Sequence, residues 1–223
     1  MMKLTLPNRI SILTILLLLA GCSSHSDLPD FTASGYLADR GAVRIWRKDS
    51  QEEISHMMTA YTPFSGGATE TTDYQWLDGK PVAIERHVSG KQPDDVTLRF
   101  DHDGALSFMQ RQLAGHREPL SADEVALYQF DAQRMLKISN DLRNGRVMLI
   151  QGRWLPGGEV ASCQGNQLRP EFDEMELEQI ARQRASASAE PVNVAWLQAP
   201  EGVQLLLVSH EDLCQSEPKE ADF

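Results

Sequence analysis

Apolar and polar residues alternate over most of the chain between residues 35 and 114. A period of two is typical of antiparallel strands that bury one face of a sheet and expose the other. Asp78-Gly79 and Asp103-Gly104 each lie between two alternating runs, and Asp-Gly favours tight hairpins because both residues accept a positive φ. The pattern therefore predicts a β-meander of about six strands.

A helix of about 22 residues is expected after the meander. Ser121 and Glu124 have the spacing of a capping box. Apolar residues then recur at intervals of three and four up to Asn144-Gly145, which is a suitable helix end. A helix of this kind has one apolar stripe, which can cover the apolar face of the meander.

The remaining chain predicts strands near 147–150 and 160–163, a helix over about 170–185 and a hairpin over 192–208. The expected fold class is α+β, mainly antiparallel β: a β-meander with a long helix packed on the sheet, and a smaller C-terminal β/α portion. The expected segments are a signal peptide at 1–21, a lipidated Cys and flexible tether at 22–34, the meander at 35–118, the helix with the C-terminal strands and second helix at 119–214, and a disordered acidic tail at 215–223. The segments 35–118 and 119–214 form either one domain or two.

The first residues have the pattern of an export signal. Lys3 and Arg9 precede an almost entirely apolar run at 10–20, which is too short to span a bilayer. The run ends in Leu19-Ala20-Gly21-Cys22, which resembles the lipobox of bacterial lipoprotein precursors. That resemblance implies cleavage before Cys22 and attachment of fatty acyl chains to this residue, which would hold the protein in a membrane.

The residues after Cys22 bear on the choice of membrane. Ser23 and Ser24 follow, so no Asp stands at the second mature position. By resemblance to the enterobacterial sorting rule, this implies the outer membrane. The rule leaves open whether the anchored domain faces inward or outward, and the periplasm-facing orientation is the expectation. The anchor at Cys22 is thus the expected membrane contact.

The charge of the chain narrows the range of partners. Loss of Lys3 and Arg9 with residues 1–21 leaves 202 residues (223 − 21) and changes the formal charge from −11 to −13 (−11 − 2). Such a charge opposes binding to phosphate backbones and to anionic headgroups. We therefore exclude nucleic acid as a partner and retain an envelope protein as the candidate.

Two cysteines remain when Cys22 is lipidated. Cys163 and Cys214 form an even pair in an oxidising compartment, which favours a disulfide that closes a loop of about 50 residues. The alternative is a pair of metal ligands, for which only His210 lies close, four residues before Cys214. Zinc ligation by a tertiary grouping of histidines stays open.

No motif in the sequence predicts catalysis or a bound cofactor. The run Asp101-His102-Asp103-Gly104 resembles part of an EF-hand loop, but Arg99 and Gln110 then occupy ligand positions, so a hairpin turn is favoured. The acidic run 171–178 is interpreted as a solvated helix face rather than a cation site. We therefore expect a protein that is not an enzyme, with no catalytic residue, metal or cofactor.

The aromatic residues of the meander have two interpretations. They form the core and cross-strand pairs, or they line a face that accepts a lipid or a peptide. The residues concerned are Trp46, Tyr61, Phe64, Tyr74 and Trp76.

The whole chain resembles an enterobacterial family of outer-membrane-type lipoproteins defined only as a domain of unknown function. The resemblance lies in the lipobox, the segment 23–31 and the run Thr62-Pro63-Phe64-Ser65-Gly66. It implies location and no activity. The leading hypothesis is a non-catalytic, lipid-anchored periplasmic protein that binds or supports another envelope component. The alternatives are a carrier of a hydrophobic ligand between sheet and helix, and a cell-wall hydrolase.

Overall fold

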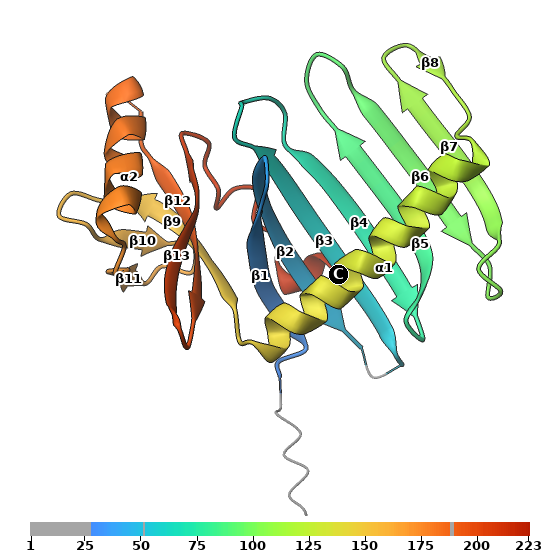
Figure 1. Cartoon of the computed structure of the whole chain (residues 1–223), viewed down its shortest axis with the longest axis horizontal. Helices are drawn as coiled ribbons and strands as arrows, with labels where there is room; N and C mark the ends of the chain where they lie inside the picture. Colours follow the sequence, from blue (N-terminus) through green and yellow to red (C-terminus); the bar gives the residue numbers. More distant parts are fainter. Residues whose placement is uncertain (1–27, 51, 188–189) are drawn as a thin grey trace, which may run out of the picture.

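The computed structural model describes residues 28–50, 52–187 and 190–223. The predicted signal peptide, the lipobox and Cys22 lie outside the described residues. Within these residues the chain forms two antiparallel sheets and two α-helices (Figure 1). The predicted α+β class with mainly antiparallel strands is confirmed. No helix in the described part of the chain is long and apolar enough to cross a membrane.

The first sheet is the predicted meander, with every strand paired to the next one in sequence. In the described residues it has eight strands instead of about six: the first begins at Phe31, before the expected start, and a two-residue strand at His116–Arg117 follows the expected end. The strands are β1 (Phe31–Ala38), β2 (Gly41–Asp49), β3 (Ile54–Pro63), β4 (Glu70–Leu77), β5 (Lys80–Val88), β6 (Asp94–Phe100), β7 (Leu106–Leu113) and β8 (His116–Arg117).

Both predicted Asp-Gly hairpins are confirmed. Asp78 and Gly79 have φ values of 50° and 71°, so this turn between β4 and β5 uses the left-handed region at both positions. In the turn between β6 and β7, the Asp101 carboxylate accepts hydrogen bonds from the backbone N–H groups of Asp103 and Ala105, at 3.0 and 2.9 Å. The Asp101 side chain therefore stabilises a hairpin.

The long helix α1 (Ala122–Asn144) follows the meander, as predicted. Its capping box is present: Ser121 Oγ accepts from the Glu124 backbone N–H at 3.2 Å, and Glu124 Oε2 accepts from the Ser121 N–H at 2.7 Å. Gly145 closes the helix in the right-handed region, and the left-handed residue is Arg146, with a φ of 55°. The helix crosses the sheet obliquely (Figure 1) and buries a core that includes Tyr74, Trp76, Ile84, Leu98 and Met135.

The C-terminal portion forms the second sheet, with the strand order β11-β10-β9-β12-β13. Its elements are β9 (Met148–Trp154), β10 (Val160–Ser162), β11 (Gln167–Leu168), α2 (Glu174–Ser186), β12 (Asn193–Ala199) and β13 (Gly202–Ser209), and a short 3₁₀ helix follows at Glu220–Asp222. This sheet packs against the side of β1 to β3 that faces away from α1, around Trp46, Leu197 and Leu206. Strand β2 is therefore buried on both faces.

Two expectations about the ends of the folded part are wrong. The tether was expected to run to Ser34, but β1 begins at Phe31, because Phe31 and Ala33 pack against the second sheet and the C-terminal residues. The acidic tail was expected to be disordered, but Phe223 packs on Phe31 and His56, with ring centroids 5.4 and 4.8 Å apart. The composition of the tail favours disorder, and the contacts of this one aromatic ring with distant residues outweigh it.

The predicted disulfide is present in the structure. Cys163, just after β10, is bonded to Cys214, which follows β13, and their Cα atoms lie 5.1 Å apart. Leu213, next to Cys214, is buried in the same core as Trp46. The bond therefore holds the start of the C-terminal tail against the second sheet.

Candidate binding groove

Helix α1 covers only part of the sheet face over which it lies. Two cavities of about 430 and 460 Å³ remain between the helix and the uncovered part of that face. Both are lined by Glu70, Thr72, Tyr74 and Asp131, so they adjoin one another. We call this continuous depression the groove. Its helix side is built by residues that recur every three or four positions: Glu124, Leu127, Tyr128, Asp131, Arg134 and Met135.

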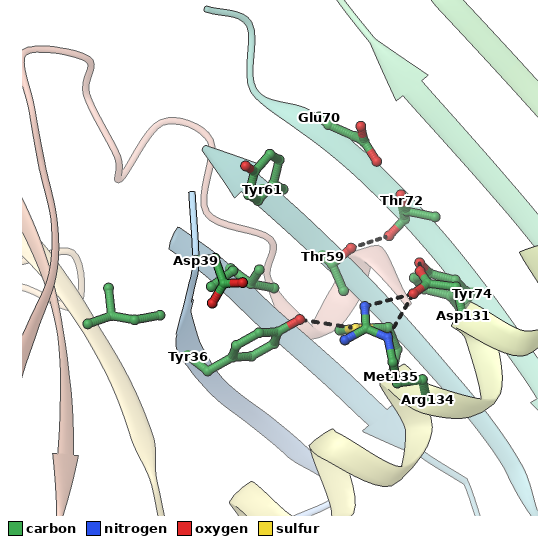
Figure 2. Close-up of a pocket in the computed structure, with 13 residues that line it drawn as sticks. Tyr36, Asp39, Thr59, Tyr61, Glu70, Thr72, Tyr74, Asp131, Arg134 and Met135 are labelled. Carbon is green, nitrogen blue, oxygen red and sulfur yellow. Dashed lines mark hydrogen bonds and ion pairs between the residues drawn. The ribbon is translucent and has the colours of Figure 1, made fainter. Parts of the chain in front are cut away.

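The first compartment of the groove lies toward β1 (Figure 2). Tyr36 and Tyr61 border it on one side, and Asp131 and Arg134 border it on the helix side. Arg134 donates to Asp131 Oδ1 through Nε and Nη2, at 3.0 and 2.7 Å, and the Tyr74 hydroxyl donates to Asp131 Oδ2 at 3.2 Å. The Asp131 carboxylate is therefore held in position from both sides.

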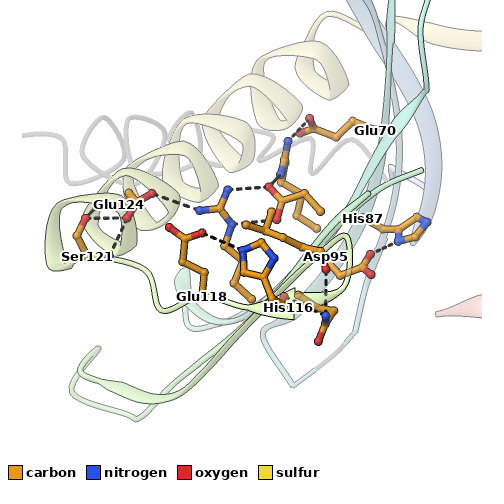
Figure 3. Close-up of polar contacts among 12 residues, drawn as sticks. Glu70, His87, Asp95, His116, Glu118, Ser121 and Glu124 are labelled. Atoms are coloured by element: carbon orange, nitrogen blue, oxygen red, sulfur yellow. Dashed lines mark hydrogen bonds and ion pairs between the residues drawn. The ribbon is translucent and has the colours of Figure 1, made fainter. Parts of the chain in front are cut away.

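The second compartment carries a ladder of alternating charges from β4 to α1 (Figure 3). Arg86 contacts Glu70 at 2.7 Å and Asp94 at 3.1 Å. Arg111 then donates twice to Asp94, at 2.9 and 3.0 Å, and reaches Glu124 at 3.6 Å. Because each charge has a partner of opposite sign, the ladder fixes five side chains in an incompletely buried site.

The electrostatic environment keeps two of the groove carboxylates, Asp94 and Glu124, ionised. Hydrogen bonds from Arg111 lower the pKa of Asp94, and the charge of Arg86 acts in the same direction. The pKa of Glu124 is lowered by its hydrogen bonds from Ser121. Burial raises the pKa of Tyr74, so its hydroxyl stays protonated and remains a donor. A general acid needs a pKa near the working pH, so Asp94 and Glu124 are suited to binding and not to proton donation.

The lowered pKa of Asp94 predicts a dependence of stability on pH. The folded state binds this proton less tightly than the unfolded state, so the contribution of Asp94 is complete above its unfolded pKa and is lost as the pH falls through its folded pKa. Replacing Asp94 by Asn should lower the free energy of unfolding at pH 7 by about 1–3 kcal/mol. The cost should shrink below pH 4. Urea unfolding at pH 7 and at pH 3.5 measures both values.

A matched control lies on the opposite face of β6. Asp95 is adjacent in sequence, with an exposed side chain that pairs with exposed His87. Asp95→Asn should change the free energy of unfolding at pH 7 by no more than about 0.5 kcal/mol. Equal effects of the two substitutions would contradict the assignment of Asp94 to a stabilising ladder.

The structure separates the aromatic residues that sequence reasoning singled out. Trp46, Tyr74 and Trp76 are buried, which confirms the core interpretation for these three. Tyr61 lines the groove, whereas Phe64 is 52% exposed outside it. The chain has four tyrosines, and all of them line the groove. They are Tyr36, Tyr61, Tyr74 and Tyr128.

Sequence reasoning missed the charged residues of the groove. One signal was available: Arg86 stands between Ile84 and Val88, at a position that the period of two assigns to the apolar face. A charge at such a position needs a partner, and Glu70 and Asp94 supply it from the two neighbouring strands.

Two further features lie outside the groove. An apolar cavity of about 620 Å³ lies between the start of β1 and the start of β9, and its lining is apolar apart from Thr32, Arg143 and Arg146. Among the described residues, Asp101, His102 and Asp103 are close enough to share a cation, but all three are exposed on the hairpin. The Asp101 carboxylate accepts hydrogen bonds from the backbone of its own turn, so the turn accounts for its presence without a metal ion.

Comparison with known proteins identifies the family. Residues 33–219 match the family described as "Protein of unknown function (DUF1481)", which is most of the chain. The chain belongs to the DUF1481 family. It is also 42% identical over 208 residues to "Uncharacterized protein YjaH" of Escherichia coli (strain K12), covering 93% of this chain and 89% of that protein. No solved structure matches significantly.

The family match confirms the coarser part of the predicted resemblance, since the family has no assigned activity and has a member in an enterobacterium. The matched region begins at residue 33, within β1, and includes every strand and helix that lines the groove. The lipobox lies outside that region, so the match does not bear on lipidation.

Proposed function

We propose that this member of the DUF1481 family is a non-catalytic lipoprotein, anchored through Cys22 in the outer membrane and facing the periplasm, that binds an envelope component in the groove. The observation that carries the binding role is the convergence of charged and tyrosine side chains from six strands and α1 on one open depression. Lining side chains are fixed by ion pairs before any ligand arrives. Preorganisation of this kind reduces the entropy cost of binding.

The anchor can be tested apart from the groove. In cells grown with radiolabelled palmitate, the full chain should carry label and sediment with the outer membrane. The Cys22→Ser variant should carry none. Labelling of the Cys22→Ser variant, or recovery of the unaltered protein from the inner membrane, would contradict this part of the proposal.

Binding in the groove can be tested by photo-crosslinking in cells. The photoreactive residue, an amino acid with a diazirine side chain, replaces Leu127. Leu127 lines the groove and is 65% exposed, so the replacement can reach a bound ligand. Diazirines insert into C–H and O–H bonds, so protein, lipid and glycan are all captured. The matched control position is Met175 on α2, which is 74% exposed and outside the groove.

The expected result is one recurring adduct from position 127 that is absent from position 175. The adduct should also be lost when Glu70→Gln is added. The same adducts from both positions, or none from position 127, would contradict a binding role for the groove.

The apolar cavity beside β1 favours a second candidate function, the carrying of a hydrophobic ligand. The sequence led us to expect a ligand between the helix and the sheet. This cavity lies instead beside the end of α1. Organic extraction of the purified lipoprotein should then release a lipid in addition to the chains on Cys22. Ala33→Leu, which narrows the cavity, should reduce the amount released. An extract that contains no further lipid rules this candidate out.

We do not extend the proposal to hydrolysis of the cell wall. Asp94 and Glu124 have lowered pKa values, and neither is suited to donate a proton to a leaving group. Their ion pairs instead give them fixed orientations.

A further inference from the structure

The polar groups of the groove include donors and acceptors side by side. In the first compartment the guanidinium of Arg134 donates, the carboxylates of Glu70 and Asp131 accept, and the hydroxyl of Tyr61 can do both. An anionic ligand needs donors only, and an ammonium group or a metal ion needs acceptors only. A ligand hydroxyl needs one of each within reach, and the groove offers that combination.

The net charge of the lining also restricts the ligand. Five carboxylates and three arginines line the two compartments, a balance of −2 (3 − 5), and the arginines pair with carboxylates of the same groove. The charge of each arginine is already balanced by a carboxylate, so the groove has no excess positive charge for a polyanion, although N–H donors remain for a neutral group. A hydrocarbon chain would strip water from charged groups without replacing their hydrogen bonds. The lining residues therefore oppose a polyanion and a hydrocarbon chain, and the donors beside the acceptors favour a neutral, polar ligand over a cation.

Three of the four tyrosines supply a surface for the ring faces of such a ligand. Tyr36, Tyr61 and Tyr128 are partly exposed, whereas Tyr74 is buried and fixed to Asp131. A partly buried tyrosine that packs on the core with one side can present part of its apolar face and its polar edge on the other. A pyranose ring has the complementary character, with C–H groups on its faces and hydroxyls around its edge.

The length and position of the groove favour an oligomer. Its lining runs from β1 to β7, six strand intervals, which at about 4.8 Å each is about 29 Å. A peptide that binds by main-chain pairing needs a free sheet edge. The groove lies on the face of the sheet, where the backbone groups of the interior strands are already used by neighbouring strands.

We infer that the groove binds a neutral glycan chain of several sugar units. This inference rests on the proposed binding function of the same groove and names its ligand class. Tyr36, Tyr61 and Tyr128 stack on the sugar rings, and Glu70, Asp131 and Arg134 bind their hydroxyls.

All four tyrosines line the groove, so NMR signals from labelled tyrosine rings report on the groove selectively. The full lipoprotein, labelled with ¹³C in its tyrosine rings and dissolved in a detergent without a sugar headgroup, gives ring signals from the groove alone. Chitotetraose is titrated in, and maltotetraose is tested in parallel. The expected result is a saturable shift of the signals of Tyr36, Tyr61 and Tyr128 with at least one of the two.

Two carboxylates provide matched variants for this titration. Glu70→Gln should weaken the binding of the active oligosaccharide by about tenfold or more, since a hydrogen bond to a charged group is lost. Glu178 has an exposed side chain on α2, away from the groove, so Glu178→Gln should leave the affinity unchanged. The unliganded tyrosine spectrum of each variant shows whether the groove is still folded.

The outcomes separate this inference from the function on which it rests. The glycan inference is wrong if neither oligosaccharide shifts the tyrosine signals at a concentration of about 10 mM, which corresponds to the weakest affinity worth assigning to a site. It is also wrong if Glu178→Gln weakens binding as much as Glu70→Gln does. Groove-dependent adducts from Leu127 in the same protein would leave the binding function standing, and a protein adduct would identify a polypeptide ligand instead. Absence of such adducts contradicts the proposed function itself.

Discussion

Replacement of both Cys163 and Cys214 by Ser is expected to lower the free energy of unfolding by about 4 kcal/mol, according to the chain-entropy relation for a loop of this length. The two residues are 51 positions apart, so the bond removes much of the freedom of the unfolded chain. It also holds the segment that carries buried Leu213. Urea unfolding of the double variant and of the unaltered protein, both under non-reducing conditions, measures the difference.

The unaltered protein under reducing conditions is the control for effects of the serine side chains. Reduction should shift the unfolding midpoint as far as the double substitution does. A loss below about 1 kcal/mol would show that the unfolded chain is already restricted in this region, or that the bond does not form in the protein.

Trp46→Ala is expected to have an effect of similar size, a loss of about 3–5 kcal/mol. Trp46 is 1% exposed and lies between the two sheets, where Ala42, Leu197 and Leu206 belong to the same cluster. Its ring also lies 5.6 Å from the guanidinium of Arg44, a buried group. Removal of the ring leaves a cavity that the sheets cannot close without moving, so thermal and urea unfolding should both register the change.

Phe64→Ala is the matched substitution at the surface. Phe64 also belongs to the meander region, but it is 52% exposed in the turn after β3. Its replacement should cost no more than about 0.5 kcal/mol. If Trp46→Ala were equally mild, the packing of the second sheet on β1 to β3 would not contribute to stability in solution.

The local features of this fold were predictable because short-range physics determines them. The period of two between β2 and β7, the Asp78-Gly79 turn and the Ser121–Glu124 capping box each depend on residues within a few positions of one another. The signals for Cys163 and Cys214 were compositional, since an even pair in an exported chain favours a disulfide. These features led to the correct fold class.

The ends of the folded region were misjudged because they depend on partners that are distant in sequence. Phe31 and Phe223 are separated by almost the whole folded chain, and each is buried partly by the other. Neither has a local pattern that predicts order, so a polar tether and an acidic tail were the natural interpretations of residues 22–34 and 215–223.

The groove was the least predictable feature. Its ladder joins Glu70, Arg86, Asp94, Arg111 and Glu124, which come from four strands and the start of α1. Strand register brings them together, and a shift by one residue would send each strand residue to the opposite face. Arg86, a charge between two apolar residues of the same face, gave the clearest hint from sequence.

The sequence by itself determined which segments become strands and helices, because alternation, capping and turn residues act within a few positions of the chain. Only the tertiary structure decided that α1 crosses the sheet obliquely and leaves part of one face open. That placement follows from the packing of Met135 and its neighbours on Tyr74 and Ile84, contacts between residues about 50 or more positions apart. The four tyrosines meet in one groove for the same reason.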